Sequence, residues 1–218
     1  MYLPKHFKGE WTEHAVPLIL SDPFASLIST DDTGLPFVTH LPLLLQDKSV
    51  GSDSTTPVLL GHVARGNPHW RLLQARPTSV VTFLGAHAYL SPQVYPDLAR
   101  VPTWNYLAVH CTVEAVLIDE PEAKDALLKK LIGDHEPAYA AQWRSLDADF
   151  QRKMLAGIVG FELRVTSFEC KLKLNQHRPE AHEATLRIYE SGSSHQRTLA
   201  DWMLRLKAEK ASGGVSAA

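Results

Sequence analysis

A short polar stretch at residues 61–70, GHVARGNPHW, is the first place where residue types and spacing suggest chemistry. Arg65 and Asn67 fall where a predicted strand passes into a predicted helix, whose first turn offers free backbone N–H groups and a positive dipole end. Such groups attract anions, and the Arg65 guanidinium would add a charged contact to a phosphate. A helix cap beside one exposed arginine explains the same residues, so this stretch alone identifies no ligand.

A second polar stretch, VPTWNY at residues 101–106, lies directly in front of a predicted strand. Thr103 and Asn105 offer a hydroxyl and a carboxamide to the edge of a heteroaromatic ring, and Trp104 offers an aromatic surface. A loop held in place by aromatic side chains that pack on the core would have the same sequence. The chemistry therefore depends on what the other stretches supply.

The third stretch, KLKLNQHRP at residues 171–179, concentrates positive charge. Lys171, Lys173 and Arg178 lie close together in sequence, with Gln176 between them, and could bind an anionic ligand. A solvated strand end is the alternative. Together the three stretches supply cations for a phosphate, amides and hydroxyls for a polar ring edge, and aromatic surfaces for a ring. That is the set of groups that a flavin mononucleotide (FMN) site requires.

Standard signatures of other active sites are missing from the sequence. We find no G-x-G-x-x-G, no phosphate loop, no G-x-S-x-G and no H-E-x-x-H. The 11 histidines are scattered, and His177 and His182 form only a weak pair near a proline, so no metal site is predicted. Cys111 and Cys170 fall at apolar positions of predicted strands, where buried thiols are expected rather than a disulfide.

The elements that position these stretches are mainly strands. Strands are predicted at residues 24–30, 36–45, 58–66, 79–85, 88–91, 107–117 and 160–174. The turn DDTG at 31–34 joins the first two as a hairpin, and residues 51–57 read as a polar loop. Helices are predicted at 11–21, 67–74, 121–136, 146–158 and 195–210.

The patterns within these strands favour an α+β fold with an antiparallel sheet. Strand 107–117 alternates apolar with polar or small residues, which indicates a half-buried antiparallel strand. The helices interrupt the strands without a regular βαβ rhythm. In strand 160–174 the apolar positions change parity after residue 165, as a bulge or a barrel corner requires. Past this bend, Lys171 and Lys173 are expected to point away from the core together.

Composition and charge limit the class of protein. The 218 residues suffice for one core, with a domain predicted at 1–180 and a polar extension at 181–218 that holds a terminal helix and a frayed tail. The net charge of −2 argues against a surface that embraces nucleic acid. No apolar run approaches the roughly 20 residues that span a bilayer, and the first residues do not read as a secretion signal. We expect a cytoplasmic protein with no membrane partner.

Seven motifs, read in order, resemble the FMN-binding negative transcriptional regulators, the PaiB-like family. They are MYLPKHF at 1–7, HLPLLL at 40–45, GHVARGNPHW at 61–70, AYLSPQVYP at 88–96, VPTWNY at 101–106, VGFEL at 159–163 and KLKLNQHRP at 171–179. The resemblance implies an antiparallel split β-barrel like that of pyridoxamine phosphate oxidases and flavin reductases. It also implies a homodimer that holds FMN near the subunit interface, with VPTWNY as a loop of the flavin or dimer site.

The resemblance also implies the residues of the FMN site. These are, by position in the motifs, Arg65, Asn67, Thr103, Trp104, Asn105, Lys173, Gln176 and Arg178. Arg65, Lys173 and Arg178 are expected to contact the phosphate, and the others the ring or the ribityl chain. The chain departs from the family pattern at Asn175 and His177, where serine and asparagine are usual. If these side chains touch the cofactor, its affinity or orientation differs here.

Three functions remain open from the sequence. The first is an FMN-binding regulator of gene expression, acting directly or indirectly; the net charge and the lack of a convincing helix-turn-helix disfavour direct contact with promoter DNA. The second is an FMN-dependent oxidoreductase, a flavin reductase or an oxidase, although no residue identifies a substrate and no catalytic residue is assigned. The third, suggested by Asn175 and His177, is a dimeric interaction module without flavin.

Overall fold

The structure is a computed structural model that describes residues 1–46, 56–97 and 99–213. Its strands are β1 (Lys8–Gly9), β2 (Phe24–Thr30), β3 (Pro36–Pro42), β4 (Leu44–Gln46), β5 (Val58–Ala64), β6 (Thr78–Leu90), β7 (Thr103–Ile118) and β8 (Ile158–Lys173). Its α-helices are α1 (Val16–Ser21), α2 (His69–Ala75), α3 (Pro121–His135), α4 (Tyr139–Ser145), α5 (Ala148–Ala156), α6 (His182–Glu190) and α7 (Ser194–Gly213). Short helical turns are η1 (Lys5–Phe7), η2 (Trp11–Ala15), η3 (Pro92–Val94) and η4 (Pro179–Ala181).

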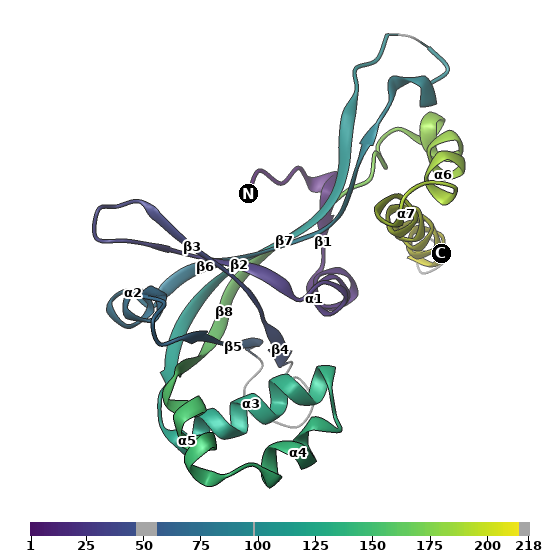
Figure 1. The fold of residues 1–218 in the computed structure, drawn as a ribbon. Helices are drawn as coiled ribbons and strands as arrows, with labels where there is room; N and C mark the ends of the chain where they lie inside the picture. Colours follow the sequence, from purple (N-terminus) through teal and green to yellow (C-terminus); the bar gives the residue numbers. More distant parts are fainter. Residues whose placement is uncertain (47–55, 98, 214–218) are drawn as a thin grey trace. The chain divides into compact units, whose positions relative to one another are not determined.

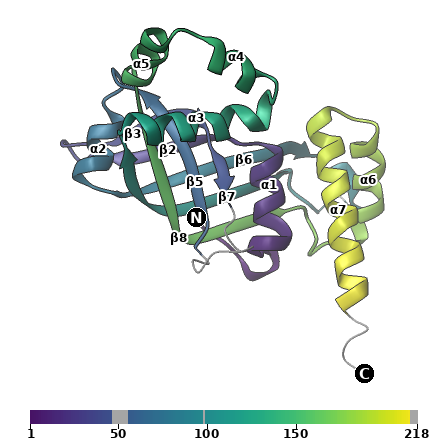
Figure 2. The same cartoon turned by 90° about the horizontal axis from the view of Figure 1, so that it is seen from below.

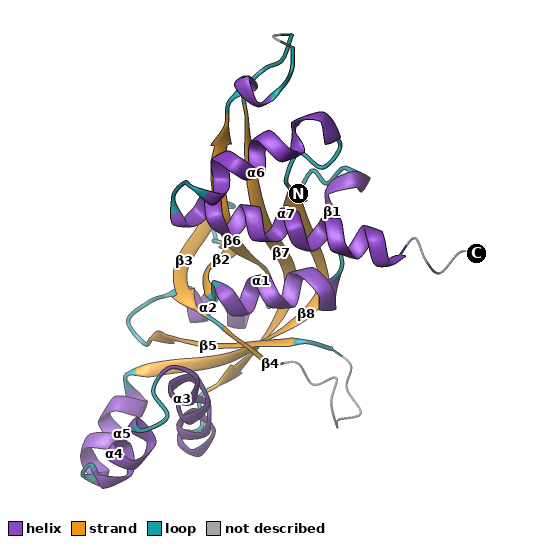
Figure 3. Ribbon diagram, turned by 90° about the vertical axis from the view of Figure 1, so that its right-hand side faces the viewer, coloured by secondary structure: helices purple, strands orange, loops and turns teal. Residues whose placement is uncertain are grey.

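The strands of the described residues form one antiparallel sheet in the order β3-β2-β6-β7-β8-β5-β4, and β1 pairs with β8 (Figure 3). This confirms the predicted α+β class. The hairpin of β2 and β3 is also confirmed: Thr30 pairs with Pro36, and the turn between them has Gly34 at a φ of 85°. Asp31 accepts hydrogen bonds from the backbone N–H groups of Thr33 and Leu35, which fixes the turn.

Four expectations about the elements need correction or completion. The strands predicted at 79–85 and 88–91 are one strand, β6, and the predicted strand 36–45 is divided between β3 and β4. Helices α4 and α6 were not predicted. The prediction that VPTWNY forms a loop is wrong, because β7 begins at Thr103 and contains the TWNY residues. The polar loop at 51–57 and the frayed tail lie largely outside the described residues.

The contacts divide the chain into two compact units. Unit 1 consists of Met1–Leu18, Leu84–Val109 and Glu169–Ala218, and unit 2 of Ile19–Phe83 and His110–Phe168. Each of the strands β6, β7 and β8 contributes residues to both units. The domain boundary expected at residue 180 stays a prediction, and the described part of the extension after it, with α6 and α7, belongs to unit 1.

Unit 2 packs α3, α4 and α5 together, with α3 against β5 (Figure 2). Leu127 of α3 is buried against Val58 and Leu60 of β5. Gly160 of β8 is needed at this contact, because a Cβ atom there would lie 2.5 Å from Cδ2 of Leu127. The close approach of helix and sheet therefore depends on a residue without a side chain.

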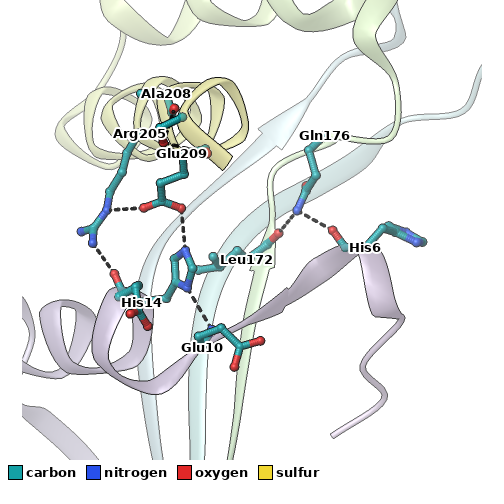
Figure 4. Close-up of polar contacts among 10 residues, drawn as sticks. His6, Glu10, His14, Leu172, Gln176, Arg205, Ala208 and Glu209 are labelled. Carbon is teal, nitrogen blue, oxygen red and sulfur yellow. Dashed lines mark hydrogen bonds and ion pairs between the residues drawn. The ribbon is translucent and has the colours of Figure 1, made fainter. Parts of the chain in front are cut away.

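Unit 1 holds α6 and α7 side by side (Figure 1) and ties α7 to the N-terminal segment. The buried His14 ring accepts a hydrogen bond at Nδ1 from the Glu10 backbone N–H, 2.9 Å away (Figure 4). Its Nε2 must therefore carry the proton, which it donates to Glu209 of α7, also at 2.9 Å. Arg205 bonds both Glu209 and the Glu13 carbonyl oxygen, and these contacts fix α7 beside η2.

Both cysteines are buried, as expected for small apolar residues of the sheet. Burial raises the pKa of the Cys170 thiol to about 12, and Glu10 adds to this effect. A thiol with such a pKa is protonated at neutral pH and is a poor nucleophile. Within the three described ranges, no helix combines the length and apolar character needed to cross a bilayer.

Candidate functional site

A cavity of about 330 Å³ in unit 1 collects half of the predicted site residues. Thr103, Asn105, Lys173 and Arg178 all line it. The remaining lining residues come from η1, from the segment before β7 and from the turn after β8: His6, Phe7, Tyr95, Arg100, Val101, Asn175 and His177. A cavity of this volume is within the range that holds a small ligand or cofactor.

Lys173 is held in this cavity by the neighbouring strand β7. Its Nζ donates hydrogen bonds to Oγ1 of Thr103 and to the carbonyl oxygen of Trp104, each 2.6 Å away. Burial, and secondarily the positive charge of Lys171, lower the pKa of Lys173 below its ordinary value. An anion beside Nζ would favour the charged ammonium and oppose this shift. A bound anion would therefore stabilise the charged form of Lys173 in this site.

Asn105 presents an unused hydrogen-bond acceptor beside the same cavity. Its side chain is fully buried, and its Nδ2 donates to the Tyr189 hydroxyl of α6, 3.2 Å away. Its Oδ1 is buried and has no hydrogen-bond partner among the described residues. A buried acceptor without a partner costs about 1–3 kcal/mol, so a ligand N–H group that reached Oδ1 would be stabilised there. Burial raises the pKa of Tyr189 to about 12, so the hydroxyl stays protonated.

The cavity also carries the other groups that a flavin nucleotide requires. Arg100 and Arg178 join Lys173 as cations, and Phe7 and Tyr95 supply aromatic surfaces. Arg100 is partly neutralised by Asp97 at 3.1 Å and Glu180 at 3.6 Å, and the described residues place no carboxylate within salt-bridge distance of Lys173 or Arg178. The donor set fits a ligand with a phosphate, an aromatic ring and an N–H donor.

The departures from the family pattern are both at the cavity. Asn175 has a φ of 61°, a left-handed conformation that asparagine tolerates better than most residues. Its Oδ1 accepts a hydrogen bond from the Tyr95 hydroxyl, 3.1 Å away. The His177 ring lies 5.0 Å from that of His6. Asn175 thus has a structural role in the turn and also forms part of the cavity wall.

The structure places Trp104 and Gln176 outside the lining of this cavity. The Trp104 side chain is 53% exposed and lies edge-on to Tyr89, with ring centroids 6.1 Å apart. Gln176 uses its carboxamide to close the turn after β8: Oε1 accepts from the Leu174 N–H, and Nε2 donates to the carbonyl oxygens of Leu172 and His6 (Figure 4). Their contacts with FMN stay predictions.

Arg65 and Asn67 belong to unit 2, where both are engaged by other groups. Arg65 donates to the carbonyl oxygens of Ala156, at 2.8 Å, and Ile158, at 3.2 Å, and forms an ion pair with Asp119. Hydrogen bonds from Arg65 and Lys124 lower the pKa of Asp119. A phosphate at Arg65 would share the guanidinium with this carboxylate, and the phosphate assignment stays a prediction.

The N-cap residue of α2 is Pro68 and not Asn67 as predicted, but Asn67 lies just before it and its Oδ1 accepts a hydrogen bond from the His69 N–H, 3.0 Å away. His69 itself is fully buried and was not singled out in the sequence. Its Nδ1 lies 2.7 Å from Thr39 Oγ1, and its Nε2 lies 2.9 Å from Ser29 Oγ. Burial lowers the pKa of His69 to about 4. The ring is therefore neutral at pH 7 and connects α2 to β2 and β3.

The sequence did not point to several residues that line the cavity, among them Phe7, Tyr95 and Arg100, or to Tyr189, which holds Asn105 from outside the lining. Phe7 and Tyr95 lie within motifs of the resemblance, MYLPKHF and AYLSPQVYP, so a signal was present. Arg100 and Tyr189 lie outside every motif. Only the packing of α6 beside β7 brings Tyr189 to Asn105.

Comparisons with known proteins show the family to which the chain belongs. Residues 1–167 match the family model described as "Putative FMN-binding domain". A relative from Bacillus subtilis (strain 168), "Protease synthase and sporulation protein PAI 2", is 34% identical over 83% of this chain and 84% of its own length.

Two solved structures are similar in fold. The conserved hypothetical protein Rv2991 of Mycobacterium tuberculosis matches with a TM-score of 0.57 and 12% identity, covering 82% of this chain and 94% of that one. The FAD and heme binding protein of Mycobacterium smegmatis matches with a TM-score of 0.53 and 20% identity, covering 72% and 68%. The fold is the antiparallel split β-barrel that the sequence led us to expect. The chain belongs to the FMN-binding domain family, and FMN is its cofactor.

Proposed function

We propose that this chain is an FMN-binding regulator of the PaiB-like type and that FMN occupies the cavity beside Lys173. The observation that carries the site is the buried Asn105 Oδ1, which has no partner among the described residues and adjoins a cavity with available cations. The regulatory part rests on the relative from Bacillus subtilis, which is named "Protease synthase and sporulation protein PAI 2".

In this proposal six of the residues that line the cavity have a defined task. Lys173 and Arg178 bind the phosphate, and Thr103 holds Lys173 in position. Asn105 accepts a hydrogen bond from an N–H group of the isoalloxazine ring, while Tyr189 holds the other end of its carboxamide. Phe7 and Tyr95 shield the ring from water. Bound FMN supplies the redox chemistry, and the protein supplies binding, orientation and electrostatics.

We further propose a cytoplasmic homodimer, with Arg65, Asn67, Trp104 and Gln176 as ring, ribityl or phosphate contacts of the assembled site. The exposed Trp104 supports an interface, because large exposed aromatics are enriched where protein surfaces meet. Regulation without direct operator contact is the form that the net charge of −2 favours.

The first experiment is a visible absorption spectrum of the purified protein, followed by titration of the apoprotein with FMN and by light scattering. We expect a yellow dimer, or saturable binding of FMN by the apoprotein. A colourless protein indifferent to FMN contradicts the flavin site. Bleaching of the bound flavin by NADH or NADPH, with turnover of an acceptor, supports an oxidoreductase in place of a regulator.

Replacing Asn105 by leucine should weaken FMN binding by roughly 5- to 30-fold, the equivalent of one hydrogen bond of about 1–2 kcal/mol. Leucine has the same number and branching of side-chain heavy atoms as asparagine but offers no acceptor. The stability of the apoprotein should change little, because the loss of the hydrogen bond from Nδ2 to the Tyr189 hydroxyl is offset by the removal of a buried oxygen without a partner. Fluorescence titration and urea unfolding of the apoprotein measure the two effects. Unchanged FMN affinity would remove Asn105 from the site.

A further inference from the structure

A second cavity in unit 1 lies wholly outside the residues that match the family model. It encloses about 310 Å³ and is lined by residues between Leu174 and Lys210, whereas the family match ends at residue 167. Its walls are the segment Leu174–Pro179, the start of α6 and the C-terminal half of α7. Figures 1 and 3 show α6 and α7 side by side, with both helices belonging to unit 1.

One part of this cavity is apolar. Leu174 and Met203 are buried, and Leu206 is half-buried, and all three contribute to the lining. An inorganic anion has no apolar surface to bury here, so the hydrophobic effect would not contribute to its binding free energy. The occupant should therefore carry an apolar body.

The rest of the cavity is positively charged. Arg178, Lys207 and Lys210 line it and are exposed, and among the described residues no carboxylate lies within salt-bridge distance of any of them. Glu183 is the single carboxylate in the lining. The balance of charge therefore favours an anionic group on the occupant.

His182 provides an independent sign of a missing partner. Its Nε2 is buried and has no hydrogen-bond partner among the described residues, and its ring belongs to the lining. Burial lowers the pKa of His182, Lys207 and Lys210 lower it further, and Glu183 opposes them. An anion in the cavity would accept a hydrogen bond from Nε2. Its negative charge would also offset the repulsion between the two lysines and the protonated His182 ring.

We propose that this cavity binds a small organic anion with an apolar body, of the class of a medium-chain or aryl carboxylate. Arg178, Lys207 and Lys210 attract its carboxylate, His182 donates a hydrogen bond to it, and Met203 and Leu206 cover its apolar body. The lining contains no phenyl or indole ring for a base to stack on, so a nucleotide is disfavoured.

The position of the cavity gives the ligand a regulatory role, and this part rests on the proposed flavin site. Lys173, Asn175 and His177 line the flavin cavity, Leu174 and Gln176 line the second cavity, and Arg178 lines both. One short segment thus separates the two ligands. An anion that draws Arg178 to its own side removes a cation from the FMN phosphate, so each ligand should weaken the binding of the other by the same factor.

The test is isothermal titration of the full-length apoprotein with octanoate, octanamide and inorganic phosphate. Octanoate should bind at one site, at least tenfold more tightly than the other two, which lack either the charge or the apolar body. The double variant Lys207→Met and Lys210→Met should lower octanoate affinity at least tenfold. Its matched control is Lys130→Met with Lys153→Met, which removes two exposed lysines of unit 2 and should leave octanoate affinity unchanged.

Each outcome decides the proposal. No saturable octanoate binding, or equal affinity in the Lys207/Lys210 variant, overturns it, and phosphate binding as tight as octanoate overturns the apolar part. Octanoate binding is measured without FMN, so it stands or falls independently of the flavin site. If octanoate binds but FMN affinity is the same with and without it, the regulatory coupling is wrong and the anion site remains.

Discussion

Lys173→Met is expected to weaken FMN binding by roughly 10- to 150-fold. A hydrogen bond to a charged group contributes about 1.5–3 kcal/mol, and methionine keeps the aliphatic stem while it removes the ammonium. The effect should be this large because Lys173 is already positioned by Thr103 and the Trp104 carbonyl oxygen, so little side-chain freedom is lost when a phosphate binds. Fluorescence titration of the apoprotein with FMN measures the change.

Lys171→Met is the matched control for this result. Lys171 lies two residues away on the same strand, but it is only 7% exposed and donates to the Tyr2 carbonyl oxygen, outside the lining of the flavin cavity. We expect its substitution to change FMN affinity by no more than about threefold, through the loss of a nearby charge alone. Equal losses in both variants would mean that net charge, and not contact by Lys173, attracts the phosphate.

Arg65→Ala extends the same comparison to unit 2. If Arg65 contacts the phosphate, as the sequence predicts, FMN affinity falls by a factor similar to that for Lys173. If its task is to hold Asp119 and the backbone after α5, the free energy of unfolding falls and FMN affinity does not change. Urea unfolding of the apoprotein beside the FMN titration separates these outcomes.

The second large effect concerns stability, because the neutral, buried His69 should make folding strongly dependent on pH. Its pKa is lowered to about 4 by burial, whereas a histidine in the unfolded chain has a pKa of about 6.5. Above pH 6.5 His69 is neutral in both the folded and the unfolded state, and its contribution to the free energy of unfolding is fully present. As the pH falls from 6.5 towards 4, the unfolded chain takes up a proton that the folded protein excludes, so up to about 3 kcal/mol of stability is lost.

Urea unfolding between pH 7.5 and 4.5 measures this loss, and two variants isolate its cause. His69→Gln has no titrating ring, so the fall in stability with decreasing pH should be smaller by up to about 1.4 kcal/mol per pH unit. Thr39→Val removes a hydrogen-bond partner of the ring but keeps the ring itself. It should lower stability at pH 7.5 and retain the dependence. An unchanged dependence in His69→Gln would show that other groups cause it.

Local sequence signals were sufficient for the hairpin, for helix α2 and for most of the strands. Asp31 and Gly34 specify the turn between β2 and β3, and Asn67 specifies the first turn of α2. These interactions lie within a few residues of each other, so the types and order of the residues are enough to predict them. Helix α6 was missed because its buried face consists largely of Thr185 and Tyr189 in an otherwise polar segment.

The sequence by itself determined the family, the antiparallel sheet and four residues that line one cavity: Thr103, Asn105, Lys173 and Arg178. Only the tertiary structure decided which hydrogen-bonding atoms of each side chain remain available to a ligand. Both ends of the Gln176 carboxamide form hydrogen bonds within the turn after β8. In Asn105, by contrast, only Nδ2 forms a hydrogen bond, to Tyr189 in a distant part of the sequence, and Oδ1 has no partner among the described residues. Hydrogen bonds between segments that are distant in sequence decide whether a polar atom has a partner. A local sequence pattern therefore cannot predict which polar atoms remain available to a ligand.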